Sequence, residues 1–362
     1  MNLHVLTLPG DGIGVEVTRQ AVRVLETVCR KFHHSLRLTE GLLGGVAIHQ
    51  TGEPFPEQTA RLALEADATL MGAVGAPEFD DWPPEKRPER GLLAIRKVLG
   101  VYANLRPVRA YKALLDSSPL KNDRVEGADL IIVRELNGGI YYGTPRGISG
   151  SGDEERGLNT MTYTRAEIAR VARVGFHLAR QRRKKLASVD KSNVLETSQL
   201  WRRVVNEVAA EFPDVTLEHI LVDNCAMQLI LNPRRFDVLV MENMFGDILS
   251  DEGAVLAGSI GMLPSASLGE KKPSGVWVGL YEPVHGSAPD IAGQDKANPL
   301  GAIGSVAAML EYSFGLTQEA AAVNAAIEAV LDAGLVTADL KPKGTPLTCS
   351  QVGEAVCDRI QS

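Results

Sequence analysis

The chain has 362 residues, of which 44% are hydrophobic and 23% are charged, and its formal net charge is -7. This length is enough for a large core and predicts two domains. The mildly negative charge, with both signs well mixed, argues against a general binder of nucleic acid or anionic membranes and favours small-molecule partners.

The absence of a membrane span or a signal peptide in the sequence and the spacing of the cysteines predict a cytoplasmic protein. No apolar run approaches the roughly 20 residues of a membrane span, and the N-terminal MNLHVLTLPGDG lacks the pattern of a signal peptide. The four cysteines, Cys29, Cys225, Cys349 and Cys357, form no CxxC pair. We expect them to be reduced core residues.

The first 80 residues alternate predicted strands and helices, as in an α/β fold. HVLTLPGDGIGVEVTRQAVRVLETV predicts a strand, a glycine turn and an amphipathic helix. The turn GDGIG, residues 10–14, departs from the GxGxxG dinucleotide fingerprint because its third glycine comes one place early, so we expect only a tight turn. SLRLTEGLLGG, PEQTARLALEAD and ATLMGAVGAP then predict a strand, a helix and a buried strand, and WPPEKRPER, residues 82–90, predicts a proline-rich loop.

Three arginines follow, each next to or within an apolar stretch of sequence. In GLLAIRK, residues 91–97, Leu92 and Arg96 are four apart and share one face of the predicted helix. Arg106 lies in the strand-like ANLRPVRAY, and Arg134 ends the buried run IIVR. A single arginine is most often a solvated or structural charge, but this set indicates bidentate capture of the carboxylates of a di- or tri-acid.

GGIYYGTPRGISGSGDEERG, residues 138–157, predicts a protruding hairpin of the kind that exchanges between subunits. Its Tyr141 either packs within this arm or donates a proton in a site, and sequence alone favours packing.

The helix predicted over 164–185 ends in RRKK, a basic last turn that the helix dipole accounts for. Lys191 follows a buried strand in LASVDKSNVLE and is either a surface charge or a base.

Carboxylates gather in the next segments. ENMFGDILSDEGAVLAGSIG, residues 242–261, follows the apolar run DVLVMEN, and together they predict a strand running into a helix on which Asp247 and Asp251 share one face. Two such charges repel unless a cation lies between them, which suits Mg²⁺ or Mn²⁺; the alternative is two solvated acids near a helix start. Asp223 lies at the C-terminal end of the strand in LEHILVDNCAMQLI, the edge where open α/β sheets bind ligands. The three aspartates are therefore predicted to cluster.

GLYEPVHGSAPDIAGQDKANP, residues 279–299, is too rich in glycine and proline for regular structure. Backbone amides of Gly286, Ser287 and Ala288 suit a phosphate and Asp290 suits ribose hydroxyls, although an ordered surface loop is an equal alternative. NPLGAIGSVAAMLEYSFG, QEAAAVNAAIEAVLDAG and SQVGEAVCDRIQ predict closing helices.

These motifs together resemble the β-decarboxylating dehydrogenase family that includes isocitrate and isopropylmalate dehydrogenases. The resemblance runs from residue 3 to about residue 350 and rests on LPGDGIG, GLLAIRK, ANLRP, GGIYYG, SVDKSNVL, ENMFGDILSDE, GMLPSASLG and EPVHGSAPDIAG. It implies a two-domain α/β fold with a parallel or mixed central sheet and without a standard Rossmann cofactor domain. Residues 1–102 and 258–362 would form a nucleotide-binding domain. Residues 103–257, with an arm at about 137–163, would carry the dimer contacts and the substrate and metal residues.

The resemblance also implies roles for individual residues in a homodimer with shared active sites. Lys191 of the partner subunit would take the substrate hydroxyl proton, and Tyr141 would donate the final proton. Substrate carboxylates would bind Arg96, Arg106 and Arg134 with Asp223 nearby, and Glu89, Leu92 and Leu93 would shape the pocket. Mg²⁺ or Mn²⁺ would bind Asp247, Asp251 and Asp223 of the partner subunit. The adenosine half of NAD would contact His285, Gly286, Ser287, Ala288, Asp290, Asn298 and Asp339.

The implied reaction is oxidation and decarboxylation of isopropylmalate in leucine biosynthesis. The pair Leu92 and Leu93 would leave the third carboxylate of isocitrate unpaired in an apolar pocket, and Asp290 would repel the 2′-phosphate of NADP. Malate, tartrate or homoisocitrate dehydrogenases would share the arginines and aspartates. A magnesium-dependent phosphate-transfer enzyme needs a loop such as GxxxxGK[ST], which this sequence lacks. A non-catalytic binding role would leave Lys191 and Tyr141 without a task.

Overall fold

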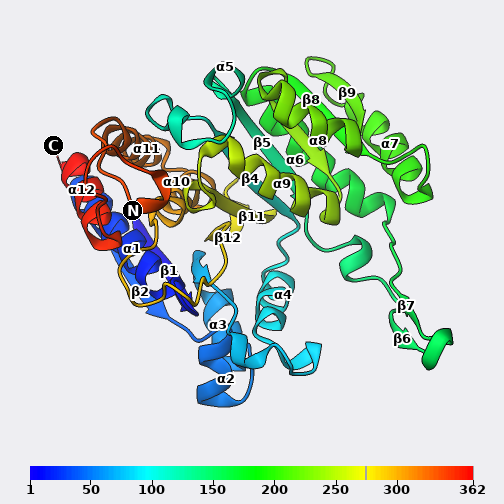
Figure 1. The fold of residues 1–362 in the computed structure, drawn as a ribbon, viewed down its shortest axis with the longest axis horizontal. Helices are drawn as coiled ribbons and strands as arrows, with labels where there is room; N and C mark the ends of the chain where they lie inside the picture. The colour runs from blue at the N-terminus through cyan, green and yellow to red at the C-terminus, as the bar shows by residue number, and fades with distance from the viewer. Residues whose placement is uncertain (274, 362) are drawn as a thin grey trace. The chain divides into compact units, whose positions relative to one another are not determined.

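The computed structural model describes residues 1–273 and 275–361 (Figure 1). The chain divides into two compact units. Unit 1 comprises Met1–Val101, Ala110–Pro119 and Ala257–Ser362, and unit 2 comprises Tyr102–Arg109 and Leu120–Leu256. The expected division differs most at 110–119, which holds the short helix η3 (Lys112–Ser117). This segment belongs to unit 1, where the Ser117 hydroxyl donates to the carbonyl of Leu340 at 2.7 Å.

Unit 1 contains five strands in the order β2-β1-β3-β12-β11. Neighbouring strands run parallel except β11 and β12, which pair antiparallel. Every residue of β3 is buried, as expected for a central strand covered on both faces. The strands are β1 (Asn2–Gly10), β2 (Ser35–Glu40), β3 (Ala68–Ala73), β11 (Pro264–Lys271) and β12 (Trp277–Pro283).

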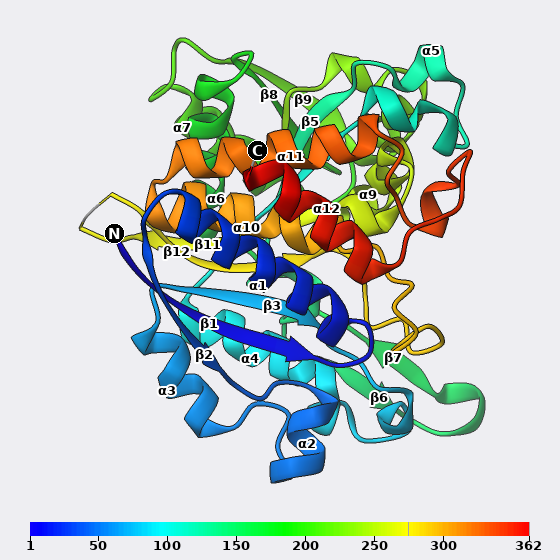
Figure 2. The same cartoon turned by 90° about the vertical axis from the view of Figure 1, so that its left-hand side faces the viewer.

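Helices cover both faces of the unit 1 strands (Figure 2). On one side α1 and α10 pack against the strands and against α11 and α12, while on the other α4 packs against β12 and α3. The helices are α1 (Gly14–Lys31), α2 (Gly45–Thr51), α3 (Glu57–Glu65), α4 (Pro88–Leu99), α10 (Leu300–Phe314), α11 (Thr317–Asp332) and α12 (Cys349–Gln361). Shorter 3-10 turns are η1 (Pro77–Phe79), η2 (Pro84–Lys86), η7 (Ile260–Met262) and η8 (Ala338–Leu340).

Unit 2 contains five strands in the order β4-β5-β10-β8-β9. β4 and β5 pair antiparallel and the others run parallel, so both units have mixed sheets and the predicted α/β class is confirmed. The strands are β4 (Ala103–Arg109), β5 (Asp129–Glu135), β8 (Lys185–Asp190), β9 (Thr216–Leu221) and β10 (Val238–Met241). Their helices are α5 (Asn122–Val125), α6 (Arg165–Gln181), α7 (Glu196–Ala209), α8 (Val222–Leu231) and α9 (Asn243–Ala257), with the 3-10 turn η6 (Pro233–Arg235).

The predicted hairpin arm projects from unit 2 (Figure 1). It consists of the antiparallel pair β6 (Gly147–Ser149) and β7 (Arg156–Leu158), with η5 (Gly152–Glu154) at the tip and η4 (Gly139–Tyr141) at the base. All residues of β6 and β7 are exposed, so the arm has no core of its own in one chain.

Three local predictions were wrong in detail. Residues 88–90 of the expected proline-rich loop open α4, because proline suits the first turn of a helix. Residues 279–283 extend β12 rather than an irregular loop. The basic run RRKK lies beyond the end of α6 at Gln181, and Arg182 there bonds the carboxylates of Asp129 and Asp237 at 2.9 and 2.8 Å.

Candidate active site

The start of α9 brings an aspartate against a buried arginine. Glu242 precedes the helix, and its carboxylate accepts the N–H groups of Met244 and Phe245 at 3.0 and 2.9 Å, which caps the helix start. A side chain at Gly246 would collide with Arg134, since its Cβ would lie 2.6 Å from the Arg134 Cγ. The glycine therefore lets the first turn of α9 approach the end of β5.

Arg106 and Arg134 are buried and held by polar side chains. Arg134, 5% exposed, donates from Nε to Asn243 Oδ1 at 3.0 Å and from Nη1 to Asp247. Arg106, 7% exposed, donates to Asn104 Oδ1 at 2.7 Å and to Ser250 Oγ at 2.5 Å. Fixed, charged guanidinium groups of this kind are suited to binding carboxylates.

Tyr141 reaches α9 rather than packing within the arm. Its hydroxyl donates to Asp247 Oδ2 at 2.9 Å, and the Arg134 guanidinium lies 5.9 Å from its ring centre. Burial, the hydrogen bond to Asp247 and the charge of that carboxylate raise the Tyr141 pKa to about 12. The phenol therefore stays protonated at neutral pH, as a proton donor must.

The donor atoms of Asp247 and Asp251 fit a hard divalent cation. Both lie on α9, where Arg106 approaches Asp251 at 3.5 Å and Asp247 at 4.0 Å. Burial raises the Asp251 pKa, Arg106 opposes that shift, and the charge of Asp247 adds to it. Repulsion between the two carboxylates thus persists beside the arginines, and a cation would relieve it.

The third predicted carboxylate has a different partner within the chain. Asp223, in the first turn of α8, accepts from Lys191 Nζ at 2.9 Å, and this bond lowers its pKa. Across residues 1–273 and 275–361, no group of three or more His, Cys, Asp or Glu side chains is arranged to hold a metal ion. One chain therefore supplies two paired carboxylates on α9 and a separate lysine–aspartate pair.

Buried groups hold Lys191 in place. Its backbone N–H donates to Ser198 Oγ at 3.0 Å. The preceding residue, Asp190, is buried and binds Arg202 through both carboxylate oxygens at 2.9 and 3.0 Å. The turn after β8 is thus fixed at the point where the lysine leaves the strand.

Helix α4 in unit 1 carries the third predicted arginine. Arg96 is buried and donates from Nη2 to Glu282 Oε1 at 2.8 Å, whereas its Nε has no hydrogen-bond partner within the described part of the chain. Leu92 packs against the core of unit 1 and Leu93 is half-buried, while Glu89 is exposed. The unsatisfied buried donor of Arg96 is available to an added carboxylate.

The predicted cofactor loop rests on the glycine turn. Ile13 N–H donates to the carbonyl of Ser287 at 2.8 Å, and Gly12, with φ of +55°, approaches that carbonyl too closely for any side chain. The GDGIG segment is therefore the tight turn that was predicted, and it supports the loop that contains His285 to Ala288.

Buried polar groups at this loop fit a nucleotide. Asn298 Nδ2 donates to Asp339 Oδ2 at 3.0 Å, so two predicted cofactor residues meet across 41 positions of sequence. Burial lowers the His285 pKa and keeps its ring neutral, and its Nε2 has no partner among the described residues. Asp290 is exposed. An unpaired buried nitrogen of this kind can bond a ligand atom or a water molecule.

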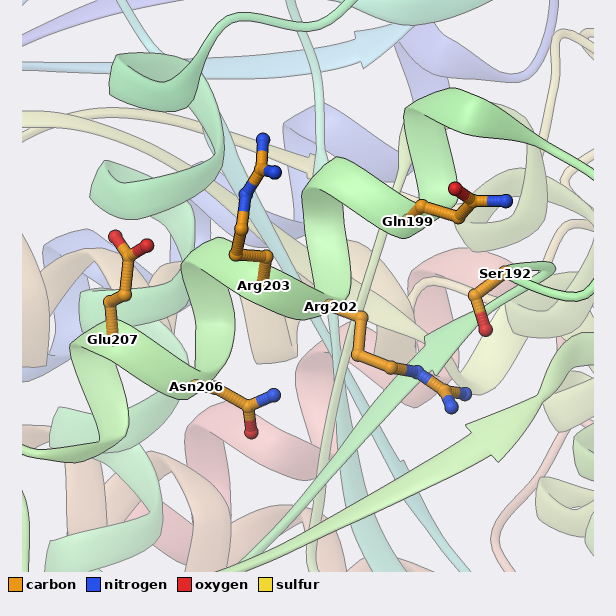
Figure 3. A pocket seen from close by; sticks show the side chains of 6 residues that line it. All are labelled: Ser192, Gln199, Arg202, Arg203, Asn206 and Glu207. Atoms are coloured by element: carbon orange, nitrogen blue, oxygen red, sulfur yellow. The ribbon is translucent and has the colours of Figure 1, made fainter.

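A surface hollow of about 640 Å³ lies along α7 of unit 2 (Figure 3). Its lining side chains are those of Ser192, Gln199, Arg202, Arg203, Asn206 and Glu207. Arg202 is bound to Asp190, and Arg203 points in a different direction, so the two arginines do not form a clamp. None of the residues predicted for substrate, metal or cofactor lines this hollow, and geometry favours the buried arginine and aspartate network instead.

Comparison with known proteins identifies the family of the chain. The family model described as isocitrate/isopropylmalate dehydrogenase matches residues 4–356. The chain belongs to this family. It is 60% identical to the 3-isopropylmalate dehydrogenase of Geobacillus kaustophilus, across 95% of this chain and 91% of that protein. It is 54% identical to the 3-isopropylmalate dehydrogenase of Halalkalibacterium halodurans, across 100% and 99% of the two chains.

Solved structures match the chain along its length. The crystal structure of isocitrate dehydrogenase from Methylococcus capsulatus has a TM-score of 0.86 at 31% identity and covers 99% of this chain and 100% of its own. A β-decarboxylating dehydrogenase from Thermococcus kodakarensis has a TM-score of 0.78 at 34% identity and covers 99% and 96%. The predicted family and its fold are thus confirmed.

Sequence reasoning missed the neutral and acidic residues that hold the arginines. They are Asn104, Ser250 and Asn243 in unit 2 and Glu282 in unit 1. A signal was present for two of them, because Asn243 and Glu282 are polar residues immediately after or within buried runs. Buried polar groups need partners, so such positions point to a network.

Proposed function

We propose that the chain catalyses the oxidative decarboxylation of (2R,3S)-3-isopropylmalate to 4-methyl-2-oxopentanoate and CO2, with reduction of NAD, in leucine biosynthesis. The observation that carries the proposal is the network in unit 2 that joins Arg106, Arg134, Tyr141, Asp247 and Asp251. Relatives that are 52–60% identical over most of their length carry the name 3-isopropylmalate dehydrogenase, which supports the same substrate.

Each residue has a task in this reaction. Arg106 and Arg134 would bind substrate carboxylates, and Arg96 would offer its unpaired Nε–H to a carboxylate. Lys191 of the partner subunit would take the hydroxyl proton as hydride leaves, and after CO2 is lost Tyr141 would protonate the carbon. When bound, NAD accepts the hydride, and Mg²⁺ or Mn²⁺ at Asp247 and Asp251 offsets the developing negative charge.

A homodimer with shared sites accounts for the separate lysine–aspartate pair. Large apolar side chains are exposed on the arm and on the helices of unit 2. Because exposed apolar surface is unfavourable in water, such side chains favour contact with a partner subunit. They are Ile148 and Leu158 on the arm, Met227 and Leu231 on α8, and Ile248 on α9. In such a dimer, Lys191 and Asp223 of the partner subunit would complete the base and the metal ligands.

Specificity is assigned to two places in unit 1. Leu92 and Leu93 would contact the isopropyl group, and with Glu89 they would shape the pocket near the nicotinamide. Asp290 is exposed on the cofactor loop, where its charge would repel a 2′-phosphate and favour NAD over NADP. Asn298, Asp339 and His285 would contact the adenosine half.

The cytoplasm is the proposed location. All four cysteines are free and buried. Burial raises the pKa of Cys29 to about 11 and that of Cys225 to about 12, so neither is a reactive thiolate at neutral pH. Among the described residues, no helix has the length and hydrophobicity needed to cross a membrane.

The test is NADH formation with 3-isopropylmalate, isocitrate, malate and tartrate, each with NAD or NADP and with or without Mg²⁺. We expect metal-dependent turnover of 3-isopropylmalate with NAD. Turnover of another hydroxy acid alone would keep the reaction type and refute the substrate assignment. Equal use of NADP would refute the role given to Asp290.

A further inference from the structure

Asn243 joins three parts of unit 2 through one buried side chain. It is 1% exposed at the start of α9. Its Oδ1 accepts from Arg134 Nε at 3.0 Å, and its Nδ2 donates to the carbonyls of Leu136 and Gly138, both at 3.1 Å. The amide thus connects the arginine of β5, the base of the arm and the helix that carries Asp247.

The orientation of this amide is determined by its partners. Arg134 Nε–H is only a donor and must face the amide oxygen, whereas two carbonyl oxygens are only acceptors and must face the NH2 group. All three polar positions of the side chain are therefore used in one orientation. A buried amide held by three hydrogen bonds to three different groups is strongly specified in position.

The base of the arm has little room to adopt another position. Gly139 has φ of +77°, and a Cβ there would lie 2.4 Å from the Tyr163 hydroxyl oxygen. That hydroxyl donates to Glu242 at 3.1 Å and accepts from the backbone N–H of Asn243 at 3.0 Å. The Gly139 N–H in turn donates to the carbonyl of Thr162 at 3.1 Å. Tyr141 lies two residues further along this fixed segment.

We propose that Asn243 is a positioning residue that sets the arm, and with it the Tyr141 hydroxyl, relative to the substrate-binding arginine Arg134. The inference rests on the proposed function, in which Tyr141 donates the last proton after hydride transfer and decarboxylation. Proton transfer requires hydrogen-bond distance, so a small shift of the arm slows this step and leaves the earlier steps unaffected.

Asn243→Asp distinguishes the contact with Arg134 from the contacts with the base of the arm. The carboxylate keeps an acceptor for Arg134 Nε–H, but it places an oxygen against the carbonyls of Leu136 and Gly138 and so removes both arm bonds. Asn243→Ser loses the contacts on both sides. The same asparagine-to-aspartate change at Asn324, exposed on α11 of unit 1, is the matched control.

The experiment follows NADH in a single turnover and in the steady state, at saturating Mg²⁺. In Asn243→Asp we expect the calorimetric Kd for 3-isopropylmalate to rise, because the new carboxylate offsets the charge of Arg134. The first-turnover burst at saturating 3-isopropylmalate should stay within about threefold of wild type. Its steady-state kcat should fall by about tenfold or more, as in Tyr141→Phe. Asn243→Ser should also weaken substrate binding, and Asn324→Asp should behave as wild type. An unchanged kcat, or a burst slowed as much as kcat, overturns the proposal.

Hydrogen exchange of the arm amides gives a readout that does not depend on turnover. The amides of Gly139 and Gly143 should exchange faster in Asn243→Asp and Asn243→Ser than in wild type, because the carbonyls at the arm base lose their partner. Exchange equal to wild type in both variants would show that Asn243 does not hold the arm. Wild-type protein that forms no NADH from 3-isopropylmalate would instead refute the proposed function, while the exchange data would still decide the positioning role.

Discussion

Leu93 offers the sharpest test of substrate specificity. Leu92 and Leu93 of α4 are both half-buried, but Leu92 packs against the core of unit 1, which includes Leu8 and Ile95. Replacing Leu92 would therefore mix lost stability with lost specificity. Leu93→Ser leaves those core contacts in place and would make the proposed substrate pocket more polar.

The expected size of the effect follows from the apolar contact removed. Leucine to serine deletes three apolar carbons, worth about 2.4 kcal/mol if fully buried at about 0.8 kcal/mol per group. The protein already covers part of Leu93, so only the part still exposed could be covered by the substrate, worth about 1 kcal/mol or roughly fivefold in kcat/KM for 3-isopropylmalate. Malate lacks the isopropyl group, and its kcat/KM should change by less than about twofold.

The assay compares kcat/KM for 3-isopropylmalate and malate in wild type, Leu93→Ser and Leu64→Ser. Leu64 lies on α3 and is 67% exposed, so its change controls for a new surface hydroxyl. A parallel fall for both substrates, or no change for either, would refute the contact between Leu93 and the isopropyl group.

Four further changes test other parts of the structure. Lys191→Met should keep NAD affinity by calorimetry and abolish NADH formation; full activity would remove this lysine from the mechanism. Asp247→Asn should raise the Mg²⁺ concentration needed for half-maximal activity by about tenfold or more, since a charged ligand is lost, and an unchanged requirement would place the metal elsewhere. Burial raises the Glu135 pKa from 4.5 to about 7, so the folded state holds the extra proton and stability falls by about 3 kcal/mol as pH rises from about 4.5 through about 7. Glu135→Gln should flatten this dependence in urea unfolding, and the same slope in the variant would contradict the assignment. Asp237→Asn breaks a buried ion pair and should lower the free energy of unfolding by about 3 kcal/mol, whereas Asp214→Asn at a surface pair should have little effect; equal losses would show that burial does not decide the outcome.

Elements with a strong local pattern were predicted from the sequence. A tight turn was predicted at GDGIG, and the structure has that turn, in which Gly10 and Gly12 adopt positive φ of +71° and +55°. The apolar run before Asn243 and the helical spacing beyond it predicted β10 and α9, which places Asp247 and Asp251 on one helix. The family and its reaction type were also readable, because the motifs that carry charge and glycine lie in short contiguous stretches.

The tertiary structure alone decided which of these groups meet. Tyr141 had a packing interpretation from its neighbours in the arm, yet its hydroxyl bonds Asp247, 106 positions away. Arg96 pairs with Glu282 across 186 positions. Neither contact has a signature in periodicity or local composition.

The physical reason is that local patterns reflect backbone geometry, whereas buried polar pairs reflect the cost of leaving a charge without a partner. That cost is paid only once the chain has folded and removed water from the site. The sequence by itself therefore determined the elements and the residue types of the site. The fold determined that Asn243 and Glu282 hold the arginines in place, because a polar residue in a buried run signals that it needs a partner but not which partner it has.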